Sequence, residues 1–194
     1  MFRRRGFARR RHLERQLLPG RRTRVARGAL RQLRRANRLM GEGDFAGAAA
    51  IFDFLADGAQ SLGLWHSPQL HLEAGRAWMR AGEATPGLDR LRHGLRLMPE
   101  MGQSHRMPLV LSRILGELRD QGFQSEADEL DREFRPLLGG VSDNPAPMAA
   151  TPSMARLPAK CPQCGGSVLP NEVEWADRQS AICDYCGSLI QSEA

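Results

Sequence analysis

The sequence predicts a mainly α-helical protein with a small β domain at its C-terminal end. Apolar side chains recur with a period of about 3.6 residues between positions 28 and 137, which is typical of amphipathic helices. All four cysteines of the 194-residue chain fall between positions 161 and 186, among short runs that favour strands. With 41% hydrophobic residues the chain can form a packed core, and its length suits one medium domain or two small ones.

The distribution of charge and of proline divides the chain. Residues 1–40 contain 15 arginines and a single acid, a net charge of +14, whereas residues 41–194 carry 13 basic and 21 acidic side chains, a net charge of −8. A stretch rich in proline and alanine separates the helical pattern from the cysteines. The sequence therefore predicts an Arg-rich arm (1–27), a helical repeat domain (28–137), a flexible linker (138–158) and a cysteine domain (159–194). A linker of this length predicts that the cysteine domain samples many positions relative to the helices.

The helical domain repeats itself three times. Gly43, Gly82 and Gly122 are separated by 39 and 40 residues, and each is followed five residues later by a small residue. A glycine adopts the left-handed conformation of a helix-to-helix turn at low cost, and a small residue lets the two helices approach closely. Three such turns predict six helices in three antiparallel pairs. Helix starts are expected at Asp44, Ser67-Pro68, Thr85-Pro86 and Pro108, and Pro99 is expected to end the fourth helix.

This pattern resembles tetratricopeptide repeats, most clearly in the middle unit. There Leu72-Glu73-Ala74-Gly75-Arg76-Ala77-Trp78 is followed by Gly82, Leu91, Gly94 and Pro99. The family's usual repeat is about 34 residues long, so the longer period here predicts longer loops, at 57–67 and 99–107. The resemblance implies a concave groove, lined by the first helix of each pair, that holds an extended peptide or a partner helix.

The resemblance also implies which residues face that groove. The candidates are Asn37, Met40, Arg76, Arg80, Arg113 and Arg119. Asn37 and Arg113 match positions of the clamp with which chaperone-binding members hold a C-terminal carboxylate, but Leu33 and Glu73 depart from that clamp. The four arginines favour an acidic peptide as the ligand. The alternative is that they lie on solvated helix faces.

The cysteines are spaced as C-x2-C-x18-C-x2-C, through Cys161, Cys164, Cys183 and Cys186. This spacing predicts a four-cysteine zinc site, because two residues between paired cysteines let a tight turn aim both sulfurs at one point. Four thiolates complete a tetrahedron, so we expect one structural Zn²⁺ with no open position for catalysis. The alternatives are two disulfides, which a cytosolic chain disfavours, and a redox pair, which is expected at a helix start.

Residues 159–191 resemble a zinc ribbon, with its Lys-Cys-Pro-x-Cys-Gly opening and its Cys-x-Tyr-Cys-Gly closing. The resemblance implies a small antiparallel sheet held by the metal and used for nucleic-acid contact, for protein contact or as a stable cap. Strands are expected at 167–169, 180–182 and 188–190. Exposed acids around the cysteines, among them Asp184, argue against phosphate binding by this domain.

The Arg-rich arm holds the candidate phosphate contacts, which are Arg3, Arg4, Arg5, Arg9, Arg10, Arg11, Arg21, Arg22 and Arg24. Such a density of arginine suits the phosphates of RNA or DNA, or an anionic membrane surface. Phe2 and Phe7 add apolar content that suits shallow membrane contact or docking on a protein. The alternatives are a disordered solubilising tail and an arm that folds back onto the acidic remainder.

The functional prediction is a non-enzymatic protein–protein interaction adaptor or scaffold. No run of residues reaches the length of a membrane span or forms a secretory signal, so a cytoplasmic location is expected. The five histidines are scattered, with His66 and His71 expected at the surface or in a cap, and the sequence has no phosphate-cradling loop or nucleophile elbow. Two alternatives rest on the arm: a nucleic-acid-binding accessory protein and a peripheral membrane-surface protein.

Overall fold

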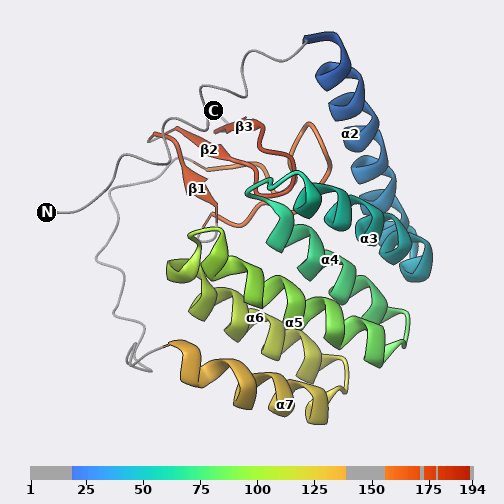
Figure 1. The fold of residues 1–194 in the computed structure, drawn as a ribbon, viewed down its shortest axis with the longest axis vertical. Helices are drawn as coiled ribbons and strands as arrows, with labels where there is room; N and C mark the ends of the chain where they lie inside the picture. The colour runs from blue at the N-terminus through green and yellow to red at the C-terminus, as the bar shows by residue number, and fades with distance from the viewer. Residues whose placement is uncertain (1–18, 139–155, 171–172, 178, 193–194) are drawn as a thin grey trace, which may run out of the picture.

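The computed structural model describes residues 19–138, 156–170, 173–177 and 179–192, with no side chains described for residues 19–25 (Figure 1). In this part of the chain, six α-helices precede a small antiparallel sheet, as the sequence predicts. The helices are α2 (Pro19–Glu42), α3 (Phe45–Ser61), α4 (Ser67–Arg80), α5 (Ala84–Glu100), α6 (Met107–Asp120) and α7 (Gln124–Phe134). The strands are β1 (Glu174–Trp175), β2 (Ser180–Ile182) and β3 (Leu189–Gln191). No helix of the described residues is both long enough and apolar enough to cross a membrane.

The three turn glycines separate the helices of each pair. Gly43, Gly82 and Gly122 have φ angles of 84°, 84° and 86°, in the left-handed region that favours glycine. The small residue that follows each turn is buried: Ala48 and Ala127 are fully inaccessible, and a Cβ on Gly87 would lie 2.5 Å from the Sδ of Met79. The predicted turn chemistry is therefore confirmed.

The predicted helix starts are only partly correct. Asp44 caps α3, since its carboxylate accepts a hydrogen bond of 2.9 Å from the backbone N–H of Gly47. The prediction of caps at Ser67 and Thr85 is wrong, because both residues are already helical and the preceding His66 and Glu83 occupy the cap positions. Proline is compatible with the whole first turn of a helix, so its presence does not fix the cap at the residue before it.

The residues that make this repeat longer than usual extend the helices rather than the loops. α3 and α5 have 17 residues each and extend to Ser61 and Glu100, so the connectors are shorter than the sequence analysis predicts. Pro99 lies inside the last turn of α5, which ends before Gly102 at a φ of 77°. The predicted boundary of the arm at residue 27 is also wrong, since α2 begins at Pro19.

Two hydrophobic clusters form the core, and α4 contributes to both. Leu70, Ala74 and Ala77 of α4 pack with α2, α3 and the C-terminal domain, which we define as the described residues from 156 to 192. Leu72 and Met79, on the other side of α4, pack with α5, α6 and α7. Because α4 is buried on both sides, it joins the two halves of the helical body.

The sheet of the C-terminal domain has the order β1-β2-β3, with both neighbouring pairs antiparallel. The predicted strand 180–182 is confirmed, and the last strand lies one residue later than predicted. Residues 167–169 form no strand; Ser167 makes one isolated bridge to Lys160. β1 was missed because its two residues pair only with β2, a long-range contact that leaves no periodic pattern.

The C-terminal domain packs directly on the helices. Cys161, Cys164, Val168 and Tyr185 belong to the same buried cluster as Leu33 of α2. Leu157, at the start of the domain, is also buried in that cluster. The domain thus packs on the body through a shared apolar cluster, and its sampling of other positions stays a prediction. The remainder of the predicted linker, residues 139–155, lies outside the described residues.

Candidate metal centre and its contacts with the helices

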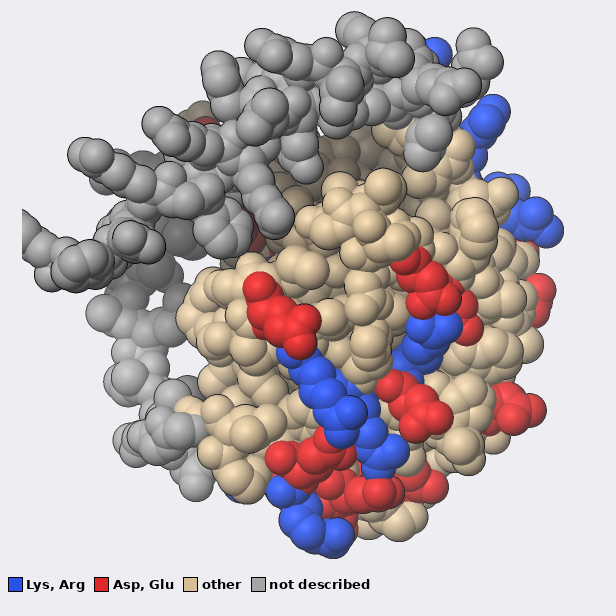
Figure 2. Space-filling view, in the orientation of Figure 1, with Lys and Arg blue, Asp and Glu red and all other residues tan. Residues whose placement is uncertain are grey.

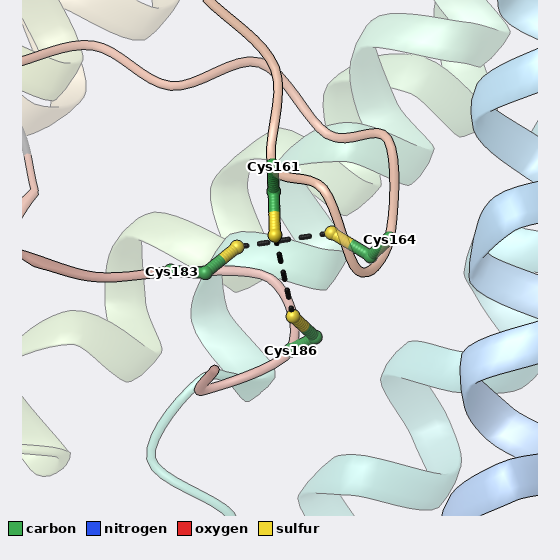
Figure 3. Close-up of side chains that lie close together, drawn as sticks. All are labelled: Cys161, Cys164, Cys183 and Cys186. Atoms are coloured by element: carbon green, nitrogen blue, oxygen red, sulfur yellow. Dashed lines mark hydrogen bonds between the residues drawn. The ribbon is translucent and has the colours of Figure 1, made fainter. Parts of the chain in front are cut away.

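Four cysteine side chains converge in the C-terminal domain (Figure 3). All four sulfur atoms lie within 4.8 Å of one another. The Sγ atoms of Cys161 and Cys186 are 3.9 Å apart, and those of Cys164 and Cys183 are 3.7 Å apart. These separations are too long for S–S bonds, so the four cysteines come together as predicted and are not joined as two disulfides.

Two turns of matching backbone geometry position the sulfurs. In the first turn the N–H of Gly165 donates to the carbonyl of Cys161 at 2.9 Å, and in the second the N–H of Gly187 donates to the carbonyl of Cys183 at 2.8 Å. Both glycines have positive φ angles, of 77° and 70°, which explains why a glycine follows each pair. The N–H of Gly166 points at the Cys164 sulfur, 3.4 Å away, where it stabilises negative charge on a thiolate.

The geometry of the sulfurs fits a tetrahedral metal ion. With Zn–S bonds of about 2.3 Å, the sulfurs of a regular tetrahedron lie about 3.8 Å apart, between the two sulfur separations of 3.7 and 3.9 Å in the structure. Cys161, Cys164 and Cys183 are buried, and Cys186 is half-buried. Four cysteines close together in this way can hold a metal ion.

The thiols also influence one another's charge. Hydrogen bonds donated by the Cys164 and Cys183 thiols lower the pKa of Cys186, whereas the bond between Cys164 and Cys183 raises the pKa of Cys164. Without added positive charge the cluster therefore favours one thiolate over several. A divalent cation supplies the charge that lets all four cysteines ionise.

The centre is fixed to the first helix of the body. The side-chain amide of Asn37 donates a hydrogen bond of 2.9 Å to the backbone carbonyl of Cys164. The guanidinium of Arg34, on the same helix, donates to the carbonyl of Gln163. α2 therefore holds the turn that carries the first cysteine pair.

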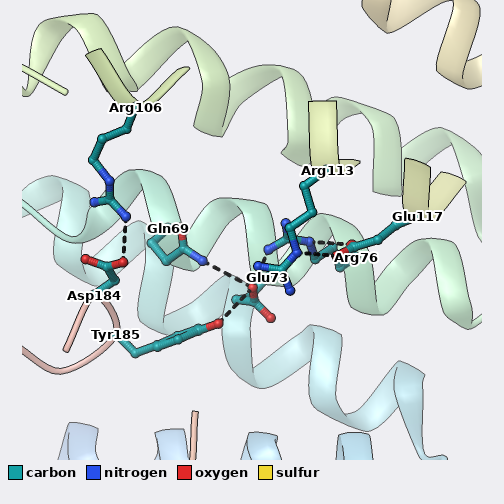
Figure 4. Close-up of polar contacts among 8 residues, drawn as sticks. All are labelled: Gln69, Glu73, Arg76, Arg106, Arg113, Glu117, Asp184 and Tyr185. Atoms are coloured by element: carbon teal, nitrogen blue, oxygen red, sulfur yellow. Dashed lines mark hydrogen bonds and ion pairs between the residues drawn. The ribbon is translucent and has the colours of Figure 1, made fainter. Parts of the chain in front are cut away.

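Asp184 and Tyr185, the two residues between the second pair of cysteines, contact Arg106 just before α6 and Glu73 of α4 (Figure 4). The hydroxyl of Tyr185 donates to Glu73 of α4 at 3.3 Å. The carboxylate of Asp184 lies 2.5 Å from a guanidinium nitrogen of Arg106, next to α6, and both side chains are largely buried. This contact corrects the prediction that Asp184 is an exposed acid. The hollow of about 10 Å³ between Gln69 and this pair can hold at most about one water, so the surfaces fit closely.

Arg76, predicted to face an open groove, is buried in this contact. Only 8% of its side chain is exposed; it forms ion pairs with Glu73 at 2.6 Å and with Glu117 at 2.7 Å. Although burial lowers the pKa of Arg76, the charges of Glu73 and Glu117 outweigh that effect and hold the pKa above its usual value. Arg76 is thus a structural charge beneath Tyr185 and does not face solvent.

Of the other predicted groove residues, the structure brings Arg113 to Arg76, because both pair with Glu117. Met40 packs against the first hydrophobic cluster, and Arg80 is exposed at the end of α4. Arg113 pairs with Glu117 at 2.9 Å, and Arg119 pairs with Asp128 at 3.1 Å. At Asn37 and Arg76 the C-terminal domain occupies the face where the resemblance places a peptide.

The candidate phosphate contacts lie mostly beyond the described part of the chain. Arg3, Arg4, Arg5, Arg9, Arg10 and Arg11 fall outside the described residues. Arg21, Arg22 and Arg24 belong to α2, but their side chains are not described. The structure therefore leaves these contacts as predictions.

Sequence reasoning missed a buried polar network between α3, α4 and α5. Gln60 accepts hydrogen bonds from His71 and His93, at 2.9 and 2.8 Å, and Arg90 donates to the other ring nitrogen of His71 at 3.2 Å. His71 is fully buried, so its predicted surface position is wrong, and burial lowers its pKa to about 4. The partners come from three helices, which is why no local spacing indicates the network.

Comparison of the chain with protein-family models, with curated proteins and with solved structures finds no match.

Proposed function

We propose that the chain is a non-enzymatic protein–protein interaction adaptor, in which a tetratricopeptide-like helical body and a zinc ribbon form one binding platform. The observation that carries this proposal is the cluster shared between the two parts, in which the metal-binding turns and α2, α3 and α4 bury the same apolar surface. Folding of the ribbon and packing of the helical body are thereby coupled.

Zinc is the metal that the ligands favour. Four thiolates at tetrahedral spacing are typical of structural zinc, and they leave no coordination position for water or substrate. A sheet with strands of two and three residues gains most of its stability from such a metal. The centre therefore supports a structural role and a non-enzymatic protein.

The repeat assignment is supported by the turns. Three glycines with nearly equal φ angles, 39 and 40 residues apart, each precede a small buried residue. Ordinary repeats of this kind hold a partner on their concave side. In this protein the ribbon takes the partner's place there. A partner consequently binds elsewhere than at Arg76 and Asn37, which the C-terminal domain covers.

The partner surface that we propose is the rim where the ribbon meets the helix connectors. Three segments come together there: Gln103 donates to the carbonyl of Trp65 at 2.6 Å, and a Cβ on Gly187 would lie 3.9 Å from the Trp65 indole nitrogen. Four exposed leucines lie on or beside these segments: Leu62, Leu64, Leu109 and Leu189. Exposed apolar side chains grouped at one end of a folded unit are typical of a protein-binding surface.

Affinity capture with matched variants tests the proposal. The immobilised zinc-loaded protein is compared with a Leu62→Glu, Leu189→Glu variant and with a Leu137→Glu control, whose leucine is equally exposed but follows α7. Captured proteins are quantified, and each is re-measured as a purified pair. We expect a partner whose affinity falls at least about tenfold in the rim variant and is unchanged in the control.

A Cys164→Ser variant completes the experiment. It removes one of four metal ligands, so zinc content should fall from one per chain to near zero and the same partner should be lost. Retention of every partner by both the rim and the cysteine variants would contradict the adaptor proposal. Circular dichroism verifies that the helices persist in each variant.

A further inference from the structure

The outer face of α2 carries a row of arginines without acidic partners. Arg27, Arg31, Arg35 and Arg38 are exposed, and none of them forms an ion pair with a carboxylate among the described residues. Arg34 lies between them in the sequence, and its guanidinium donates to Gln163 of the C-terminal domain. Gln163 carries no charge, so this contact does not neutralise Arg34. The row therefore keeps its full positive charge.

On the later helices most arginines form ion pairs. Eight of the ten arginines between Ser67 and Leu138 form ion pairs with Asp or Glu, and Arg80 and Arg132 form none among the described residues; the eight are Arg76, Arg90, Arg92, Arg96, Arg106, Arg113, Arg119 and Arg135. Figure 2 shows this contrast, with blue and red side chains adjacent over the lower helices and blue without red at the upper right, beside α2. A basic composition alone does not explain a helix whose described arginines lack acidic partners.

The arginines form a narrow stripe on the helix. At about 100° per residue, Arg27, Arg31, Arg34, Arg35 and Arg38 fall within an arc of about 100°, and they extend over about 16 Å of the helix axis. Three pairs are spaced four residues apart, and each such pair of like charges destabilises a helix by about 0.2–0.5 kcal/mol. A ligand with closely spaced negative charges would relieve this repulsion.

The opposite face of α2 faces the body. Leu33 and Ala36 are buried in the first hydrophobic cluster, and Leu30, Leu39 and Met40 pack against it. The outer face therefore has no large apolar side chain with which to enter a bilayer, as amphipathic membrane-surface helices do. The stripe is purely electrostatic and suits a ligand that presents phosphates at a solvent-exposed surface.

We propose that this outer face of α2 binds the phosphate backbone of nucleic acid. A duplex carries one negative charge per about 1.7 Å of its axis, so a stripe about 16 Å long faces several phosphates, and the forked guanidinium binds phosphate oxygens in pairs. The site lies on a folded helix that is fixed to the metal centre through Asn37. It is independent of the leucine rim and of the protein partner proposed above.

The experiment measures binding to a fluorescein-labelled DNA duplex of about 20 base pairs and to a single-stranded RNA of about 20 nucleotides. The test variant changes Arg27, Arg31, Arg35 and Arg38 to Gln. The control changes Arg80, Arg96, Arg119 and Arg135 to Gln, which removes the same formal charge from exposed positions on α4, α5, α6 and just after α7. Affinity is measured over a series of salt concentrations with the zinc-loaded full chain.

For the test variant we expect at least about a tenfold loss of affinity at low salt. The magnitude of the slope of log affinity against log salt for the duplex should fall by up to about 3.6, because each of the four phosphate contacts contributes about 0.9. The control should keep the affinity of the wild type to within a factor of about three, and its slope should be unchanged to within about one unit. Lysine at the same four α2 positions should restore most of the binding, which separates charge from helix stability.

Two results would overturn the proposal. One is equal loss of affinity in the test and control variants, which would mean that only net charge matters. The other is failure of the wild type to bind either nucleic acid while it binds vesicles of anionic phospholipid. The Leu62→Glu, Leu189→Glu variant should bind nucleic acid like the wild type, so this proposal and the adaptor proposal can fail separately.

Discussion

The side-chain amide of Asn37 donates a hydrogen bond of 2.9 Å to the carbonyl of Cys164, 127 residues further along the chain. Asn37 lies in α2, the first described helix, and Cys164 is a ligand of the candidate metal centre. The bond fixes the turn between Cys161 and Cys164 to the helical body. Stability of the metal centre and packing of α2 should therefore depend on each other.

Replacing Asn37 tests this dependence. Asn37→Ala leaves the carbonyl of the buried Cys164 without its donor, so the free energy of unfolding of the zinc-loaded protein should fall by about 1–2 kcal/mol. The zinc affinity, measured by competition with a chromogenic chelator, should fall as well. Gln32→Ala, on the exposed side of the same helix, is the control and should change neither quantity. Equal stability of the two variants would show that the bond contributes nothing.

Two helix glycines should respond in opposite ways to alanine. A Cβ on Gly75 would lie 2.7 Å from Leu91 and 2.9 Å from the backbone carbonyl of Gly87, so Gly75→Ala should force α4 and α5 apart and cost about 1–3 kcal/mol. Gly116, inside α6, has nothing within 4 Å of that position, and Gly116→Ala should stabilise the protein by about 0.5–1 kcal/mol. Urea denaturation measures both, and stabilisation by Gly75→Ala would refute the close contact.

Removing the buried guanidinium of Arg76 should be costly. Arg76→Met leaves the carboxylate of Glu73 buried without its cation, and the loss of one partner of a buried pair typically costs about 3–5 kcal/mol. Adding Glu73→Gln removes the unpaired charge but keeps an oxygen for the Tyr185 hydroxyl. The double variant should therefore regain at least about half of the lost stability in thermal or urea unfolding. No recovery would mean that the damage comes from lost packing.

Stability should fall as the pH is lowered below neutrality because of His71. The pKa of His71 is lowered by burial from 6.5 to about 4, so the unfolded chain binds more protons than the folded chain between these values. The stabilisation is complete above pH 6.5 and is lost as the pH falls toward 4. Between about pH 7.5 and 5.5 this linkage amounts to about 1 kcal/mol.

The variant His71→Gln should lack that part of the pH dependence. Its free energy of unfolding is compared with that of the wild type at each pH, with zinc content measured in parallel so that metal release is not mistaken for histidine protonation. His105→Gln is the control, since His105 is exposed next to α6. Identical pH dependence of the wild type and His71→Gln would contradict the role of the buried ring.

Local patterns of the sequence predict the parts of this molecule that depend on neighbouring residues. The turns at Gly43, Gly82 and Gly122, the cap at Asp44 and the convergence of four cysteines all follow from short spacings and from the conformations open to glycine. Strand β2 and the six helices are predicted for the same reason. The same patterns do not predict the start of α2, because proline and arginine are compatible with more than one position at the beginning of a helix.

Only the tertiary structure decides how these parts use their surfaces. Arg76 and Asn37 have the spacing of groove residues, yet the C-terminal domain encloses both, since burial of the shared apolar cluster outweighs the freedom of an independently placed domain. The arginines of α2 and those of the later helices look alike in sequence. Among the described residues, the fold brings carboxylates from a neighbouring helix to later arginines such as Arg92 and Arg96 and none to Arg27, Arg31, Arg35 and Arg38, because α2 lies at the end of the helical stack with one face unpaired.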